Sequence, residues 1–357
     1  MPQPKADSPD RSKPVRIVAL GGGTGLSTLL RGLKEYVARR RGDFVRHPIG
    51  DLAAVVTVTD DGGSSGRLRR DYRVLPPGDI RNCMVALSKD EALLGRLFQY
   101  RFNAGRGLRG HSFGNLFLTA LTHVTGDLIR AVQLSGEVLA IRGRIFPSTN
   151  QNVSLKAVMT DGTRVAGETR IARSRKRIRR VSLVPRRVQP LPEVMEAIAT
   201  ADLILFGPGS LYTSIIPNVL VAGVAEAIEK SPATCIYISN LMTQPGETTG
   251  LSVADCVRAI HLHAGRKLLD WVVANNQPVS PGVARRYRLQ GAQPMSADLA
   301  ELQKLGLRCV LDNLLEEHGV VRHNPERLTR LLLEEFVARP RRALDSVVTP
   351  VPVRSIN

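Results

Sequence analysis

The stretch VRIVALGGGTGLSTLL, residues 15–30, places an apolar run directly before a glycine-rich turn and the start of a helical pattern. Residues 15–20 predict a strand, and the apolar spacing of residues 26–38 predicts a helix. The turn between them holds Gly21, Gly22, Gly23, Thr24 and Gly25. Because glycine leaves the backbone bare, N–H groups can converge there on an anion at the positive end of a helix. The stretch predicts a site for a nucleotide or another phosphorylated molecule; the alternative is a purely structural tight turn.

The spacing of this turn differs from two familiar phosphate-binding loops. A GxxxxGK[ST] loop needs a lysine, and none follows Gly25; a GxGxxG loop needs glycine where Leu26 stands. The acidic residue that binds ribose in NAD proteins is also missing, since Asp43 lies in an arginine-rich loop rather than at a strand end. The sequence therefore disfavours NAD as the ligand.

The order strand, helix, strand recurs along the chain. Further strands are expected at 53–59, 201–206, 233–239 and 268–274, and further helices at 217–229 and 252–264. Consecutive parallel strands need a crossover connection, so this order predicts an α/β, Rossmann-like fold with a mostly parallel sheet and helices on both faces. Each polar or glycine-rich cluster follows the carboxyl end of a strand, where open α/β sheets bind their ligands.

The remaining segments have other patterns. Residues 79–102 and 112–139 predict helices, with a cap near Thr125 and Asp127, and 325–337 predicts a closing helix. Alternating runs at 152–159, 164–171 and 178–184 predict a small β insertion at about 143–187. We expect a disordered arm at 1–14, a single domain at 15–338 and a basic flexible tail at 339–357.

The charge of the 357-residue chain is formally +18, and half of the excess is local. Residues 164–187 hold ten basic residues against Glu168 alone and no aromatic residue that would stack on bases. Solvated strand faces are therefore favoured over nucleic-acid binding, with non-specific contact to polyanions as the alternative. Residues 1–14 do not resemble a secretory signal, no apolar run approaches the roughly 20 residues of a membrane span, and the four cysteines form no CxxC pair. These features predict a cytoplasmic protein.

Three clusters between the halves carry candidate site residues. Asp60 and Asp61 follow a predicted strand, and paired carboxylates there suit a divalent cation such as Mg²⁺ or a sugar hydroxyl; the alternative is a solvated turn. Asp79 is either a site residue or the cap of the next helix, whose first turn would present Arg81 and Asn82. His111 and Asn115 open another helix, where His111 is either a base or a structural residue.

A second turn of the anion-binding type follows the strand at 201–206. It contains Gly207, Gly209 and Ser210. Two phosphate-binding turns that converge on one sheet edge suit a diphosphate, such as that of a nucleotide sugar. A third loop, residues 244–248, adds the Gln244 amide, a carboxylate and a hydroxyl that would contact a base or sugar; a plain loop is the alternative.

These clusters together resemble the YvcK family of gluconeogenesis factors, within the CofD-like 2-phospho-L-lactate transferase superfamily. The resemblance spans about residues 15–335. It rests on GGGTGLSTLLRGLK at 21–34, TDDGGSSGRLR at 59–69, PPGDIRNCMVALS at 76–88, GHSFGNL at 110–116, GPGSLYTSIIPNVLV at 207–221, TQPGET at 243–248 and RHNPERL at 322–328.

The resemblance implies a Rossmann-like protein that binds UDP-sugars, especially UDP-N-acetylglucosamine, and is needed for cell shape and envelope synthesis on gluconeogenic carbon sources. The two glycine turns would border the phosphates, and Asp60, Asp61, Asn82 and Asn115 would line the centre where related enzymes act. We expect a regulator that responds to its ligand through a loop or an oligomeric state read by a protein partner. The alternative is a Mg²⁺-dependent transferase of the 2-phospho-L-lactate type, with Asp60, Asp61 and Asn82 as catalytic candidates.

Overall fold

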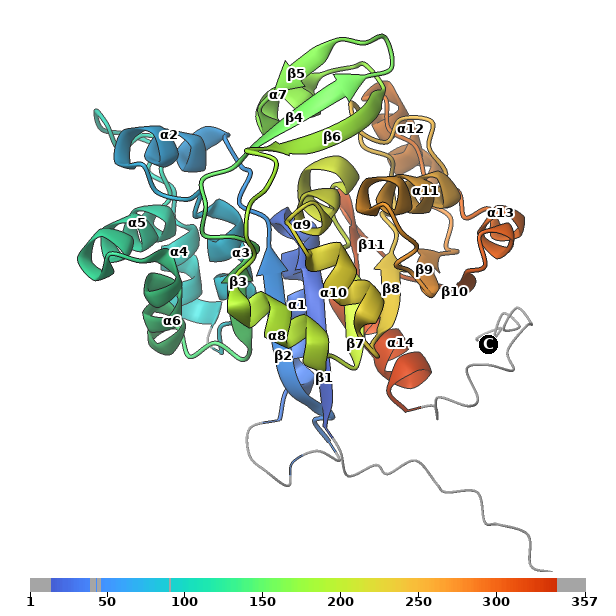
Figure 1. Cartoon of the computed structure of the whole chain (residues 1–357), viewed down its shortest axis with the longest axis horizontal. Coiled ribbons are helices and arrows are strands. Elements are labelled where there is room, and N and C mark those ends of the chain that lie inside the picture. The colour runs from blue at the N-terminus through green and yellow to red at the C-terminus, as the bar shows by residue number, and fades with distance from the viewer. Residues whose placement is uncertain (1–13, 39–42, 44–45, 90, 339–357) are drawn as a thin grey trace, which may run out of the picture.

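A seven-stranded sheet in the order β10-β9-β8-β7-β1-β2-β3 forms the centre of the computed structural model, which describes residues 14–38, 43, 46–89 and 91–338 (Figure 1). Each pair of neighbouring strands is parallel. The strands are β1 (Val15–Gly21), β2 (Ile49–Val56), β3 (Arg144–Pro147), β7 (Leu203–Phe206), β8 (Thr234–Ile238), β9 (Trp271–Asn275) and β10 (Arg308–Asp312). The predicted α/β, Rossmann-like fold is confirmed.

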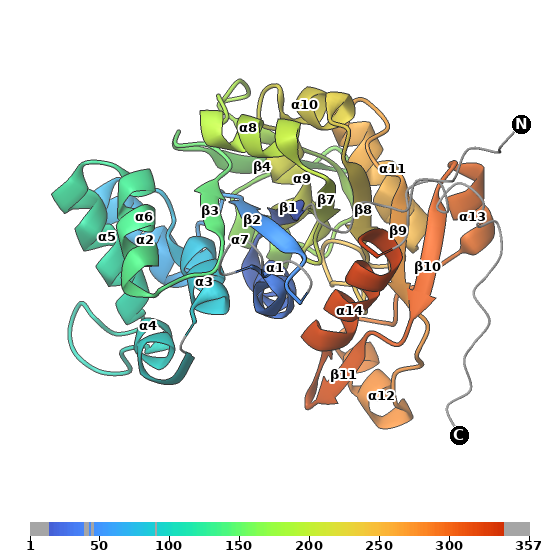
Figure 2. The same cartoon turned by 90° about the horizontal axis from the view of Figure 1, so that it is seen from below.

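The sheet is covered on both faces, which explains why its central strands are apolar runs rather than alternating ones. In β1 the last five residues are all buried. One face carries α1 (Gly23–Leu33), α3 (Gly78–Leu87) and α14 (Pro325–Phe336), and the other carries α8 (Pro192–Thr200), α10 (Val224–Lys230) and α11 (Val253–Ala264) (Figure 2). Helix α1 packs through leucines at the i, i+3, i+4 and i+7 positions, namely Leu26, Leu29, Leu30 and Leu33.

Helix ends follow sequence signals that can be recognised in advance. Ser252 and Asp255 form a reciprocal capping box at the start of α11. Asp127 accepts hydrogen bonds from the first backbone N–H groups of α6 (Leu128–Val138), so the cap expected there is confirmed. Helix α5 (Phe113–Thr125) precedes α6. Asn324 caps α14, whose first residue is Pro325.

Two predicted helices are interrupted. The one at 79–102 consists of α3, a π-helical turn at Glu91–Gly95 and α4 (Arg96–Gln99). The one at 217–229 consists of α9 (Ile216–Val219), which continues a π-helical turn at Leu211–Ile215, and α10. Gly223, with φ of 77°, separates the last two helices in a conformation that favours glycine. Shorter elements are the 3₁₀ turn at Lys34–Tyr36 and α2 (Gly63–Tyr72).

The β insertion is smaller than predicted. Its antiparallel sheet has the order β5-β4-β6, formed by β4 (Ser154–Met159), β5 (Arg164–Ala166) and β6 (Ile178–Val184), and it lies at the top of Figure 1. Residues 144–147, which fall within the predicted insertion, are β3 of the main sheet because they pair with β2. The strand expected at 164–171 ends at Ala166, since Gly167 with φ of 94° turns the chain into α7 (Glu168–Arg173).

The segment after residue 278 is more ordered than its sequence pattern indicates. It forms α12 (Pro281–Leu289), α13 (Leu299–Lys304), the edge strand β10, and a hairpin of β11 (Leu315–His318) and β12 (Val320–His323). The arm expected at 1–14, apart from Pro14, and the tail expected at 339–357 lie outside the described residues. Among the described helices, none is by itself long and apolar enough to cross a membrane; one bent pair, 211–219 with 224–230, meets the criteria of length and composition alone.

Candidate functional site

The two glycine turns meet where the strand order reverses. β1 pairs with β2 on one side and with β7 on the other, so the turn after β1 lies beside the turn after β7. Their backbones are in such close contact that a Cβ on Gly25 would stand 2.3 Å from the carbonyl oxygen of Pro208. In doubly wound sheets this switch point is where ligands bind. The convergence predicted from two distant glycine clusters is thus present in the fold.

Side chains hold the second turn in place. The Asn240 amide accepts a hydrogen bond from the Gly209 N–H at 3.1 Å and donates one to the Gly209 carbonyl at 2.9 Å. The buried Asn218 amide donates to the Gly21 carbonyl at 3.2 Å and to the Ser214 carbonyl at 2.8 Å. These contacts fix both turns before any ligand arrives, which reduces the entropy cost of binding.

A cleft of about 720 Å³ opens over the two turns. This volume lies in the range of sites for ligands larger than a single ring. The predicted site residues that line it are Gly22, Gly23, Thr24, Gly25, Asn82, Gly209, Ser210 and Gln244. The predicted residues that lie outside this lining are Gly21, Asp60, Asp61, Asp79, Arg81, His111, Asn115 and Gly207. The glycine turns thus form the floor of the cleft, and most of the predicted charged groups lie behind it.

Asp79 lies directly behind the first turn. It does not cap α3, because that helix begins one residue earlier with Pro77 at its N-cap. Its carboxylate instead accepts a hydrogen bond from the Gly23 N–H, and a Cβ on Gly22 would stand 2.7 Å from Asp79 Oδ2. Burial, together with the nearby Asp60 carboxylate, raises the pKa of Asp79 to about 6. The site therefore contains an acid that titrates close to neutral pH.

The insertion contributes a second acid with a perturbed pKa, the half-buried Glu168, which the sequence predicts only as a charge on a solvated strand face. Thr59 donates to its Oε2 at 2.8 Å. Burial and the Asp60 and Asp79 carboxylates raise the pKa of Glu168 well above its usual value. Nothing in the local sequence distinguishes Glu168 from a solvated glutamate, because the contact spans more than a hundred residues.

Asp60 and Asp61 are oriented toward different partners. Asp60 accepts from the Gly62 N–H at 2.8 Å, whereas Asp61 accepts from the Thr169 N–H at 2.9 Å and so anchors the insertion. Within the described part of the chain, no group of three or more His, Cys, Asp or Glu side chains is arranged to hold a metal ion. Magnesium at Asp60 and Asp61 stays a prediction.

The remaining candidates on this side are buried, and the side chains of two of them contact neighbouring side chains within hydrogen-bond distance. His111 is buried, its Nδ1 lies 2.9 Å from Ser64 Oγ, and burial and nearby Arg67 lower its pKa. Arg81 is also buried and donates to Asn82 Oδ1 at 2.6 Å, which positions the Asn82 amide at the cleft. The buried Asn115 Oδ1 finds no hydrogen-bond partner among the described residues.

The third predicted loop contributes less to the cleft than its sequence suggests. Glu247 is buried and accepts from the Tyr212 N–H at 3.0 Å and from Thr213 Oγ1 at 2.8 Å, so its carboxylate stabilises the turn that follows Ser210. Thr248 Oγ1 accepts from the Gln244 N–H at 2.8 Å. Of the three side chains expected to contact a base or sugar, Gln244 alone lines the cleft.

Sequence reasoning missed one wall of the cleft, formed by α1 and the segment after residue 280. It includes Arg31, Tyr287 and Arg322, together with His323. His323 is buried, contacts the Ser239 carbonyl through Nε2 at 3.1 Å, and has a pKa lowered by burial to about 4. The motif RHNPERL at 322–328 contains Arg322 and His323 and is the part of the sequence that points to this wall.

Comparison with known proteins agrees with this geometry. The family described as "2-phospho-L-lactate transferase CofD" matches residues 17–315. A protein of Nostoc sp. is 51% identical over 324 residues, covering 90% of this chain and 68% of its own. The protein named "Gluconeogenesis factor" of Bacillus subtilis is 45% identical over 320 residues, covering 89% of this chain and 97% of its own.

A solved structure is similar over nearly the same range. The crystal structure of a Bacillus halodurans protein superposes with a TM-score of 0.85 at 45% identity, covering 90% of this chain and 100% of that one. Sequence and structure thus agree over the whole sheet and both turns. The chain therefore belongs to the 2-phospho-L-lactate transferase CofD family and, within it, to the gluconeogenesis factors.

Proposed function

We propose that this protein is a cytoplasmic regulator that binds a UDP-sugar of the UDP-N-acetylglucosamine type and reports its level to a protein partner in cell-envelope synthesis during growth on gluconeogenic carbon sources. The observation that carries the proposal is the contact between the two glycine turns at the switch point of the sheet, where a Cβ on Gly25 would stand 2.3 Å from Pro208 O. The Gly23 N–H group donates to Asp79 and the Gly209 N–H group to Asn240, so the other N–H groups of the two turns are the ones offered to an anion. Such paired turns suit a pyrophosphate.

The size and charge of the cleft support the same ligand class. A cleft of about 720 Å³ accommodates groups on both sides of a pyrophosphate. Its wall carries Arg31 and Arg322, whose guanidinium groups recognise phosphate oxygens in a bidentate manner. The lining therefore combines fixed backbone donors with cationic side chains.

Calorimetric titration tests this proposal most directly. UDP-N-acetylglucosamine, UDP-glucose, GDP and NAD are compared with and without Mg²⁺. We expect a micromolar dissociation constant for a UDP-sugar, little heat from NAD, and no product after prolonged incubation. Tight binding of NAD together with no signal from any UDP-sugar would overturn the proposal.

The regulatory part requires that occupancy changes the protein. Hydrogen exchange and light scattering with and without UDP-N-acetylglucosamine measure loop protection and oligomeric state. We expect protection to increase in the turns at 21–25 and 207–210, with a change in a loop or in oligomeric state. Identical exchange and mass in both conditions would leave a partner nothing to recognise and would contradict regulation.

A transferase is the second candidate, because the carboxyl groups of Asp60, Asp79 and Glu168 lie near one another behind the first turn. Mg²⁺ held at Asp60 or Asp61 would neutralise a diphosphate leaving group. Phosphorus NMR of a nucleoside-diphosphate donor mixed with an alcohol acceptor then shows transfer to the acceptor hydroxyl by the wild type, with the nucleotide as leaving group, and none by Asp61→Asn, with donor affinity retained. Asp161→Asn is the matched control, since Asp161 is exposed in the turn between β4 and β5 and pairs with Lys176. An unchanged donor in the wild type would exclude this candidate.

A further inference from the structure

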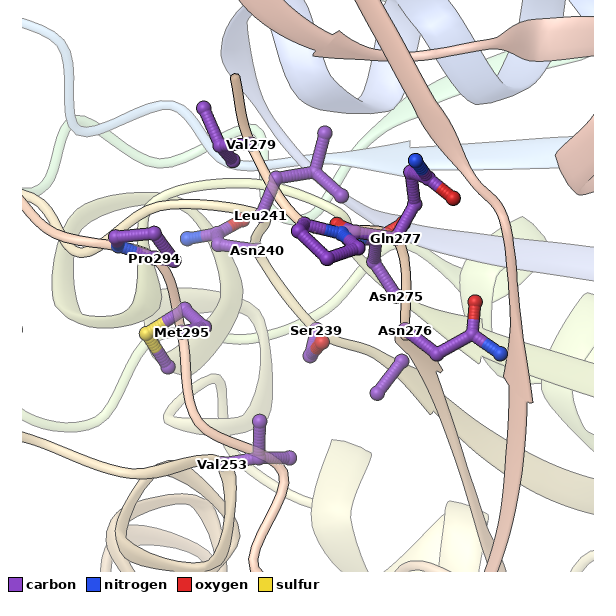
Figure 3. A pocket seen from close by; sticks show the side chains of 12 residues that line it. Ser239, Asn240, Leu241, Val253, Asn275, Asn276, Gln277, Val279, Pro294 and Met295 are labelled. Atoms are coloured by element: carbon purple, nitrogen blue, oxygen red, sulfur yellow. The ribbon is translucent and has the colours of Figure 1, made fainter. Parts of the chain in front are cut away.

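A second pocket of about 320 Å³ opens at the carboxyl ends of β8 and β9, beside the cleft (Figure 3). The two cavities share Asn240 and Leu241 as lining residues. Because it lies outside the glycine turns, the diphosphate does not require it. Its presence therefore needs a separate explanation.

The lining of this pocket is uncharged. Figure 3 shows the amides of Asn276 and Gln277 on one side and the apolar side chains of Val253 and Met295 on the other. Its described lining contains no Asp, Glu, Lys, Arg or His. Such a surface offers a phosphate no counter-charge, and it suits an uncharged ring that has apolar faces and hydrogen-bonding edges.

The pocket lies within reach of a ligand anchored on the turns. Strands of one sheet are about 4.8 Å apart, so the gap between β8 and β9 lies about 10 Å from the gap between β1 and β7. Asn240 connects the pocket to the second turn. Its side-chain amide is hydrogen-bonded to the N–H and carbonyl groups of Gly209, and the residue lines both cavities. The position of the pocket relative to the second turn is thus fixed.

We infer that this pocket binds the nucleobase of the ligand whose diphosphate lies on the two glycine turns, an inference that rests on the proposed function. A nucleobase is flat and uncharged, with apolar faces and polar edges that match the Val253 and Met295 wall and the Asn276 and Gln277 amides. A pyranose carries hydroxyl groups around its ring and fits such an apolar wall less well. The cavity is at the lower end of ligand-site volumes, so it has room for one ring and for part of the group attached to it.

Methyl NMR tests the pocket without depending on the diphosphate. The chain has six methionines, and Met295→Leu assigns the Met295 methyl signal in protein labelled with ¹³C-methyl methionine. We expect uridine and UDP to shift this signal, and inorganic pyrophosphate and free N-acetylglucosamine to leave it in place. Met195, on α8 and outside both linings, is the internal control. A shift caused by N-acetylglucosamine and not by uridine would overturn the inference in favour of a sugar site.

A filling variant gives a second readout. Val279 is half-buried at the pocket, and Val279→Trp should weaken UDP binding at least about tenfold while pyrophosphate binding changes less than twofold. Val124→Trp is the matched control, because Val124 is 82% exposed on α5. Equal weakening of UDP and pyrophosphate, or of neither, would contradict a base pocket.

The outcomes separate the two proposals. If UDP-N-acetylglucosamine binds and the Met295 signal stays in place, the base pocket fails and the proposed function stands. If uridine shifts Met295 and UDP-N-acetylglucosamine does not bind, the proposed function fails and the pocket stands. If no probe binds or shifts a signal, both fail.

Discussion

The two flanks of the glycine turns have opposite chemistry. On the β2 side, Asp60, Asp79 and Glu168 are gathered behind the turn, and burial raises the pKa of the last two. On the β8 side, the pocket that begins at Asn240 has an amide and apolar lining without charge. The two turns therefore lie between a flank that carries carboxyl groups and a flank without charged side chains.

This difference would orient the proposed ligand. An ionised Asp79 behind the first turn would repel a diphosphate toward the other flank, since like charges at short range in a medium of low dielectric repel strongly. The uncharged part of the molecule would then extend toward β8 and β9. The acidic flank would thus influence the orientation of the ligand, although its carboxyl groups lie outside the lining of the cleft.

Gly25→Ala should have the largest effect, because it disrupts the contact between the two turns on which the comparison depends. The added methyl would stand 2.3 Å from Pro208 O and 2.7 Å from the carbonyl carbon, and neither backbone atom can move freely. We expect UDP-sugar affinity to fall more than about 100-fold and the free energy of unfolding to fall by about 1–3 kcal/mol. Calorimetry and urea denaturation measure the two effects.

Gly282→Ala is the matched control for that variant. Gly282 lies in α12, and a Cβ there would meet nothing within 4 Å. Alanine is the better helix former, so this variant should bind normally and unfold at the same or a slightly higher urea concentration. Normal ligand binding by Gly25→Ala would show that the turns need not touch.

Asn240→Ala tests the connection between the turn and the neutral flank. The variant loses two hydrogen bonds to Gly209, so the second turn becomes mobile. We expect affinity for UDP and for pyrophosphate to fall about 30-fold, or about 2 kcal/mol, as measured by calorimetry. An equal fall for both ligands indicates a loosened turn. A fall for UDP alone would place the function of Asn240 in the base pocket.

The two glycine turns and the acidic flank also differ in how far the sequence predicts them. The sheet, the first turn and the second turn followed from local patterns, because an apolar run, a glycine cluster and a helical period all lie within about 20 residues. The meeting of the turns followed from topology, since parallel strands deliver their carboxyl ends to one edge. These parts of the site were predictable because their causes are local or set by strand order.

Glu168 and the hairpin wall were not predictable in the same way. Glu168 reaches Thr59 across 109 residues, and its burial depends on how the insertion packs. Arg322 enters the cleft through a hairpin whose short strands have little periodicity. Asp79 fits a helix cap by sequence equally well, and the packing of α3 against the glycine turn decided otherwise. Such contacts depend on tertiary packing rather than on local pattern.

Asp79→Asn tests the acidic flank through pH. At pH 8 the wild-type carboxylate, whose pKa is raised to about 6, is ionised and repels the ligand, so the variant should bind UDP-sugar about tenfold more tightly. At pH 5 the wild-type group is already protonated, and the two affinities should be nearly equal. Calorimetry at both values measures the ratio. A ratio that does not change with pH would assign the repulsion to another group.

The same variant alters stability in a defined direction. The pKa of Asp79 is higher in the folded protein, about 6, than the ordinary aspartate value of 3.8. Its stabilising contribution is therefore complete below about pH 4 and is lost as the pH rises through about 6, to a limit of about 3 kcal/mol. We expect Asp79→Asn to unfold at higher urea than the wild type at pH 8. Parallel stability curves for the two proteins from pH 4 to 8 would contradict this assignment.

His111→Ala should have the smallest effect on binding, because His111 lies behind the acidic flank and outside the cleft. Its ring is hydrogen-bonded to Ser64 Oγ at 2.9 Å, and burial keeps its pKa below the usual value, so the neutral ring has a structural role at neutral pH. We expect affinity within twofold of wild type and a loss of about 1–3 kcal/mol in unfolding free energy. In a double-mutant cycle, Ser64→Ala should show coupling with His111→Ala in stability and none in binding. Loss of binding without loss of stability would instead show that His111 takes part in ligand binding. The acidic flank would then contact the ligand directly, as the neutral flank is inferred to do.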